Sequence, residues 1–179
     1  MNAPVLGPIL PPVRKSVVVP WSVDAAFRRF TAELASWWPL ATHSVGQERA
    51  VTCRFEERVG GEIYEVRDDG ERTVWGTVLV WEPPARVRFT WHPGRPAETH
   101  QEVELRFTAE ASGTRLELAH SGWERAGREA KSARRAYNLG WIYVLDLYRD
   151  QRTFTVRALD LVIAIAKRLR RKPAATASA

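Results

Sequence analysis

Apolar and polar residues alternate along most of the middle of the chain, as at Val51, Cys53 and Phe55 with polar neighbours between them. Further segments of the same kind follow, separated by turn residues roughly every 8–12 positions. Clean alternation is typical of an antiparallel sheet with one exposed face and one covered face. The predicted strands lie at about residues 14–19, 51–55, 63–67, 73–81, 87–91, 103–107 and 114–121.

Two stretches instead repeat apolar residues at helical spacing. Ser22 can cap the first, and it must end by Trp38, because Pro39 disfavours helical geometry at the residue before it. The second is expected over residues 125–150, which contain no proline. Its apolar stripe starts with alanines and ends with aromatic and aliphatic residues: Ala126, Ala130, Ala133, Tyr137, Trp141, Val144 and Tyr148. Such a helix would cover one face of the sheet, and its slim first half would leave space beneath it.

The sequence divides into one domain and two ends. Residues 1–12 hold four prolines and no charge, and they are expected to form a flexible arm, extended or disordered. Residues 13–150 carry the predicted sheet and helices. Residues 151–172 show a further amphipathic helical pattern that is rich in basic side chains, and residues 173–179 are expected to be a disordered tail.

Composition and charge narrow the class of protein. A chain of 179 residues that is 45% hydrophobic and 27% charged fits one globular domain with a sizeable core. The net charge is +6, but residues 1–150 are balanced, and the excess lies beyond them in seven basic side chains against Asp160. Because the body has no basic stripe, no specific nucleic-acid partner is expected.

The basic amphipathic end allows three interpretations. Residues 153–172 could pack on the domain as a structural helix, or they could bind a protein partner or a second copy of the chain. They could also lie on an anionic membrane surface as a peripheral contact. No apolar run is long enough to span a bilayer, and the N-terminus has no signal-peptide pattern, so a cytoplasmic location is expected.

A series of short motifs follows a recognisable order along the chain. They are Trp37-Trp38-Pro39 with His43, Phe55 to Gly61, Tyr64-Glu65, Trp75-Gly76, Trp81 to Pro84, Phe89-Thr90-Trp91 and Thr114 to His120. With the order of strands and helices, they resemble the START/Bet v 1-like (SRPBCC) superfamily over about residues 13–150. Within it, the chain is similar to the branch related to the C-terminal domain of the activator of Hsp90 ATPase (AHSA1-like).

The resemblance implies an α+β helix-grip fold, in which a curved antiparallel sheet of six to seven strands wraps on a long C-terminal helix. Members share a cavity between sheet and helix, usually for a hydrophobic or amphipathic ligand. They include lipid carriers, polyketide cyclases and co-chaperone domains, so the fold alone does not fix a function. The branch has no single catalytic signature that can be transferred to residues of this chain.

The candidate ligand-binding residues combine aromatic walls with a few polar groups, because apolar pockets with sparse polar groups are typical of small-molecule sites. They are Trp37, Trp38, His43, Tyr64, Glu65, Trp75, Trp91, His120, Tyr137 and Trp141. Ordinary core packing is the alternative for most of these aromatic residues. Glu65 and His120 could form a buried acid–base pair, or His120 could be a satisfied core histidine.

The familiar catalytic and metal-binding motifs are missing from the sequence. The four histidines are scattered without metal-ligand spacing, and Cys53 fits an inert core thiol, so no metal or cofactor is expected. The leading hypothesis is binding of a small hydrophobic or amphipathic ligand in the cavity. The alternatives are an AHSA1-like co-chaperone that acts through its surface, and a cavity enzyme of cyclase or dehydratase type.

Overall fold

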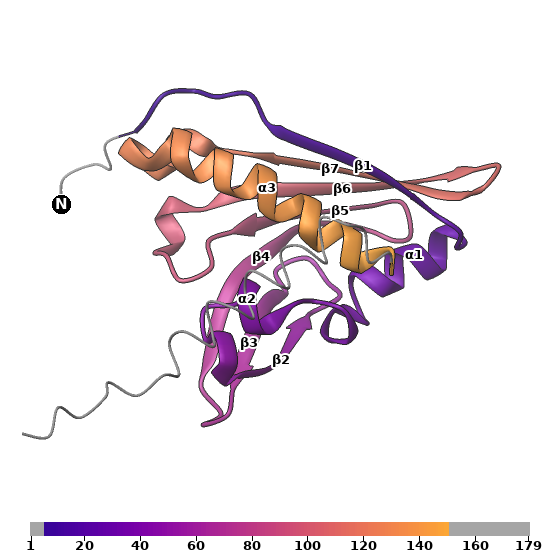
Figure 1. Cartoon of the computed structure of the whole chain (residues 1–179), viewed down its shortest axis with the longest axis horizontal. Coiled ribbons are helices and arrows are strands. Elements are labelled where there is room, and N and C mark those ends of the chain that lie inside the picture. The colour runs from indigo at the N-terminus through magenta and orange to yellow at the C-terminus, as the bar shows by residue number, and fades with distance from the viewer. Residues whose placement is uncertain (1–5, 151–179) are drawn as a thin grey trace, which may run out of the picture.

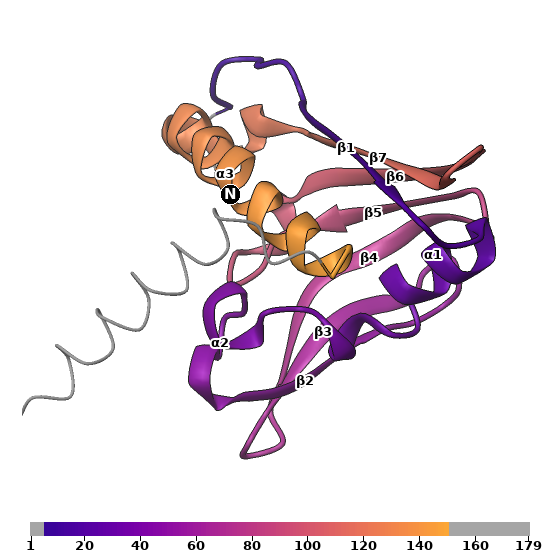
Figure 2. The ribbon, with the colours of Figure 1, turned by 45° about the vertical axis from the view of Figure 1, so that its right-hand side comes forward.

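Seven antiparallel strands form one curved sheet, and a long helix lies across its concave side (Figures 1 and 2). This computed structural model describes residues 6–150, so the interpretations of residues 151–172 and 173–179 fall outside the described residues. The strand order across the sheet is β1-β7-β6-β5-β4-β3-β2. The strands are β1 (Val13–Val19), β2 (Ala50–Phe55), β3 (Glu62–Arg67), β4 (Arg72–Glu82), β5 (Arg86–Trp91), β6 (Gln101–Glu110) and β7 (Gly113–Ser121). The helix-grip fold expected from the sequence is therefore confirmed.

The helices follow the predicted pattern with corrected ends. Helix α1 (Val23–Phe30) starts at Ser22, whose hydroxyl accepts the Ala25 N–H at 3.3 Å, and a 3-10 turn at Leu34–Ser36 replaces its expected last turns. Helix α2 (Leu40–His43) is a single turn. Helix α3 covers Ala130–Tyr148 and follows a 3-10 segment at Trp123–Glu129. The α-helix begins at Ala130 and not at residue 125, where the sequence predicts it. The reason is Gly127, whose φ of 57° favours glycine and interrupts the helix.

The inner face of the sheet carries the core, as the alternation predicts. On β5, Val87, Phe89 and Trp91 are buried, whereas Arg86 and Arg88 point to the other face and pair with Glu104 and Glu102. Further aromatic residues from α1 and α3 close this core from the helical side, and the hydroxyl of Tyr148 donates to the Ala26 carbonyl at 2.8 Å. The stripe predicted for α3 faces the sheet.

Strand β4 bends near its middle, and the bend shapes the concave side. Its first half pairs with β3 and its second half with β5, and the register shifts between Val78 and Val80. A Cβ at Gly76 would lie 1.7 Å from the Thr90 carbonyl oxygen, so only glycine allows this approach. The bend lets β2 and β3 curl toward α2 (Figure 2), where they support the candidate site.

Residues 6–12, part of the arm expected to be extended or disordered, run extended along the start of the α3 region (Figure 1). The Gly7 N–H donates to the Glu124 carbonyl at 2.7 Å, and the Arg134 guanidinium donates to the Pro11 carbonyl at 2.7 Å. Leu10 packs against the core between these two points. The slim, alanine-rich half of the helical region is therefore also a docking site for the arm.

Candidate functional site: a tryptophan-lined pocket

A pocket of about 340 Å³ opens between α3, the segment that follows α2, and the loop between β5 and β6. Its lining is mostly apolar: Trp38, His43, Ser44, Val45, Gln47, Trp91, Pro93, Gly94, Tyr137, Gly140, Trp141 and Val144. This volume is at the small end of the range for small-molecule sites. Five of the ten residues singled out by the sequence line it: Trp38, His43, Trp91, Tyr137 and Trp141.

Three tryptophans form the closed end of the pocket. The ring centroid of Trp38 lies 5.8 Å from that of Trp91 and 6.2 Å from that of Trp141, and the last two are 6.2 Å apart. Trp75 packs behind Trp38 and Trp91. The space behind them, toward Phe30 and Phe55, is about 10 Å³, so side chains fill this part of the interior. The pocket lies beside α3, on the side of the sheet where the sequence predicts a cavity.

His43 presents a polar edge to the pocket from α2. Its ring stacks on Tyr143 with centroids 5.0 Å apart, and its Nδ1 lies 2.8 Å from the Thr42 hydroxyl. Its carbonyl accepts the Trp38 indole N–H at 2.7 Å, so the two pocket residues fix each other. Burial lowers the pKa of His43, which favours a neutral ring at neutral pH.

Tyr137 and Trp91 supply the other polar groups of the pocket. Burial raises the pKa of Tyr137, which keeps its hydroxyl protonated. The buried Trp91 N–H meets no acceptor with hydrogen-bonding geometry among the described residues. The Trp91 N–H lies beside the Tyr137 hydroxyl, and this contact favours the phenolate form slightly.

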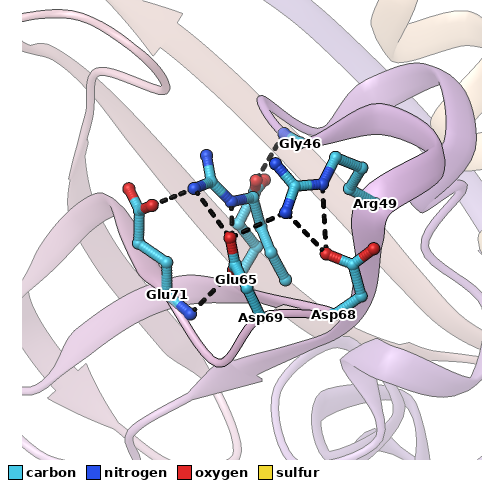
Figure 3. Close-up of polar contacts among 7 residues, drawn as sticks. Gly46, Arg49, Glu65, Asp68, Asp69 and Glu71 are labelled. Atoms are coloured by element: carbon cyan, nitrogen blue, oxygen red, sulfur yellow. Dashed lines mark hydrogen bonds and ion pairs between the residues drawn. The ribbon is translucent and has the colours of Figure 1, made fainter.

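Glu65 does not face the pocket but holds its rim. The carboxylate is fully buried on β3 and accepts N–H groups from Val45 at 2.8 Å, Gly46 at 2.5 Å and Trp75 at 2.8 Å. Figure 3 shows the bond to Gly46. Because charge-assisted bonds of this kind are strong, one side chain joins the backbone of the rim to the tryptophan core.

An exposed ionic network supports the same rim from outside (Figure 3). The Arg49 guanidinium lies 2.9 Å from Asp68 and 2.7 Å from Asp69. These two ion pairs join the start of β2 to the turn between β3 and β4. On the other side of the pocket, Arg95 lies 2.7 Å from Glu129 and links the β5–β6 loop to the start of the α3 region. Both rims are thus attached to regular elements.

His120 lies behind the pocket wall, fully buried, and does not meet Glu65. Its Nδ1 accepts the Trp141 indole N–H at 3.0 Å, and its Nε2 is buried without a partner among the described residues. Burial lowers the pKa of His120 to about 3. Of the two interpretations of His120, the acid–base pair with Glu65 is not formed, because Glu65 belongs to the rim contacts and His120 to a cluster with Trp123 and Tyr137.

Three further candidates lie away from the pocket. Tyr64 is on the opposite face of β3 from Ile63 and Glu65, with the Arg72 guanidinium 3.7 Å above its ring. Alternation along the strand requires this, since adjacent residues point to opposite faces. Trp37 packs on Phe30 and donates its N–H to the Arg29 carbonyl at 2.6 Å, and Trp75 is core.

Most of the chain matches a known protein family. Residues 21–147 match the family model described as activator of Hsp90 ATPase homolog 1-like protein. The chain belongs to this AHSA1-like family. The matched residues include every tryptophan and tyrosine that lines the pocket. Among curated proteins, no sequence matches this AHSA1-like chain.

Solved structures share the fold of this AHSA1-like protein. A Mesorhizobium loti protein is 17% identical and has a TM-score of 0.55, over 78% of this chain and 94% of its own. An AHSA1-like protein from Aeromonas hydrophila is 19% identical, with a TM-score of 0.54 over 84% and 94%. The anthrahydroquino-γ-pyrone synthase Txn09 is 37% identical, with a TM-score of 0.51 over 73% of this chain and 88% of Txn09.

Sequence reasoning missed the pocket residues that are not aromatic or titratable. Ser44, Val45, Gln47, Pro93 and Gly94 lie in connections whose path the hydrophobic pattern does not encode. Gly140 could have been recognised from the sequence. Glycine destabilises the interior of a helix, so its presence there indicates that space is needed at this position. Its hydrogen faces the pocket, where an added Cβ would lie 3.7 Å from Nε2 of His43.

Other chemistry suggested by residue type is not assembled within residues 6–150. No three His, Cys, Asp or Glu side chains are grouped there in a way that could hold a metal ion. Burial raises the pKa of the Cys53 thiol to about 12, which disfavours the reactive thiolate. In the same part of the chain, no helix is long and apolar enough to cross a bilayer.

Proposed function

We propose that this AHSA1-like domain binds a small, planar and mostly apolar molecule in the pocket between α3 and the segment after α2. The observation that carries the proposal is the closed end made by Trp38, Trp91 and Trp141. Aromatic side chains bury flat apolar surface well, and ring–ring contacts add to the gain from burial. His43 and Tyr137 add a few polar groups at the opening, which would orient the ligand.

One relative supports a fused-ring ligand. The 37% identical protein is a synthase named for an anthrahydroquinone fused with a pyrone. A flat ring system of this kind suits a shallow pocket floored by indoles better than a long acyl chain would, because the deep interior is filled. We therefore propose fused aromatic rings as the ligand class.

A second candidate is catalysis on the same ligand. The same relative favours it, and so do the neutral ring of His43 and the hydroxyl of Tyr137 on the pocket wall. A neutral imidazole and a hydroxyl that line the same pocket could assist proton transfer to or from a bound ring. An activator of Hsp90 would instead act through its surface and would not depend on the pocket.

Native mass spectrometry of the purified full chain tests ligand binding. We expect added mass that is lost on denaturation, or binding of added fused-ring aromatics detected as a higher melting temperature. Gly140→Leu should abolish both effects, because its side chain would fill the pocket opposite His43. Ala136→Leu is the matched control, since Ala136 is exposed on the same helix and does not line the pocket.

Two results would contradict the proposal. One is a wild-type chain with neither added mass nor a thermal response to any fused-ring aromatic tested. The other is unchanged binding in Gly140→Leu, which would place the ligand elsewhere.

A further inference from the structure

His43 sits in a short chain of hydrogen bonds that favours one position for its ring proton. The Thr42 hydroxyl is 3.2 Å from the Pro39 carbonyl oxygen and 2.8 Å from Nδ1 of His43. A carbonyl oxygen only accepts, whereas a hydroxyl has one proton to donate. Both contacts are satisfied only when Thr42 donates to Pro39 and Nδ1–H of His43 donates to Thr42.

This proton count leaves Nε2 of His43 without a hydrogen. A neutral imidazole carries one N–H, so a ring that donates from Nδ1 accepts at Nε2. The neutral state is favoured because burial lowers the pKa of His43. The stack on Tyr143 and the bond from Trp38 to the His43 carbonyl keep the ring in place.

The bare nitrogen faces the pocket. Nε2 lies 3.7 Å from the position of a Cβ at Gly140, and both residues line the pocket. With only a hydrogen at residue 140, a ligand can reach Nε2 beside the helix backbone. The indole N–H groups of Trp38 and Trp141 already donate within the protein, to the His43 carbonyl and to Nδ1 of His120. An indole has no acceptor, so among the aromatic residues that line the pocket, His43 is the strong acceptor.

We infer that His43 selects ligands that carry a ring hydroxyl, a phenol or enol, which donates its proton to Nε2 while the ring lies on the tryptophans. This inference rests on the proposed function and adds the ligand's polar group to it. His43 would be a specificity-determining residue, and Thr42 its positioning residue.

The first test needs no ligand. In the full chain labelled with nitrogen-15, the two ring nitrogens of His43 have distinct shifts that report which one carries the proton, and His43→Phe identifies the signal. We expect a protonated Nδ1 and a bare Nε2 at neutral pH. A protonated Nε2 would overturn the inference.

The second test compares naphthol with its methyl ether, which has the same rings but no donor. Wild-type protein should bind naphthol about fivefold more tightly, the amount that one net hydrogen bond supplies. In His43→Phe, which keeps a ring against Tyr143, the ratio of the two affinities should fall to about one. Thr42→Val should reduce the ratio while conserving the side-chain shape.

The outcomes separate the two proposals. If the wild-type chain binds neither naphthol nor its methyl ether, the proposed function fails, and the inference about His43 fails with it. If it binds both equally, or if His43→Phe keeps the preference for naphthol, the pocket proposal stands and the assignment to His43 is wrong. Binding of the methyl ether to the variants shows that they are folded, so a lost preference cannot come from unfolding.

Discussion

At the scale of single residues, the most informative side chain is one that sequence reasoning assigned to the ligand. Glu65 was expected in the pocket, but its buried carboxylate holds the backbone of Val45 and Gly46. Its partners lie about twenty residues earlier, in a connection with no periodic pattern. The sequence could show that a charged side chain lies among apolar strand residues. It could not show which backbone N–H groups would donate hydrogen bonds to it.

Glu65→Gln should lower the free energy of unfolding by about 2–4 kcal/mol. An amide has one acceptor oxygen for three N–H groups and would turn its own NH2 toward some of them. Urea denaturation measures the change. Glu62→Gln, on the same strand and paired with Arg72 on the surface, should change it by less than about 1 kcal/mol. Equal effects of the two substitutions would refute the rim role.

At the scale of elements, alternation and helical spacing predicted all seven strands and the face that α3 presents. They did not predict the bend in β4 or the interruption at Gly127, because both depend on backbone conformations rather than on side-chain polarity. The pocket lies where these irregular features bring α2, the β5–β6 loop and α3 together. Pattern alone therefore identifies its aromatic floor and misses its rims.

Two glycine substitutions should have opposite effects. Gly76→Ala should lower the free energy of unfolding by about 3 kcal/mol or more, because its methyl group would overlap the Thr90 carbonyl and force the strands apart. Gly140→Ala should raise it by about 0.5–1 kcal/mol, since alanine favours the helix and its methyl meets only ordinary contact. Chemical denaturation of both variants checks the pair. Stabilisation by Gly76→Ala would contradict the close approach at the bend.

At the scale of the whole molecule, burial of a histidine links stability to pH. The pKa of His120 is about 3 in the folded protein and near 6.5 in the unfolded chain. Between pH 3 and pH 6.5, the unfolded chain therefore binds a proton that the folded protein excludes. Protonation would place a second N–H against the Trp141 indole. Stability is therefore complete above about pH 6.5 and is lost as the pH falls.

The slope of the unfolding free energy against pH tests this link. Between pH 6.5 and 5, His120 should contribute up to about 1.4 kcal/mol of unfolding free energy per pH unit, with His43 acting in the same direction. His120→Asn, whose side-chain oxygen can still accept from Trp141, should be less stable overall but flatter with pH. A variant slope equal to that of the wild type would show that His120 does not carry the effect.

The packing of Trp38, Trp91 and Trp141 also has an optical consequence. Indole centroids 5.8 to 6.2 Å apart are close enough for their electronic transitions to couple. A flat molecule seated on them would change the shared excited state, and so the near-ultraviolet circular dichroism and the emission. The spectra of these three tryptophans would therefore report whether the pocket is occupied, without any added label.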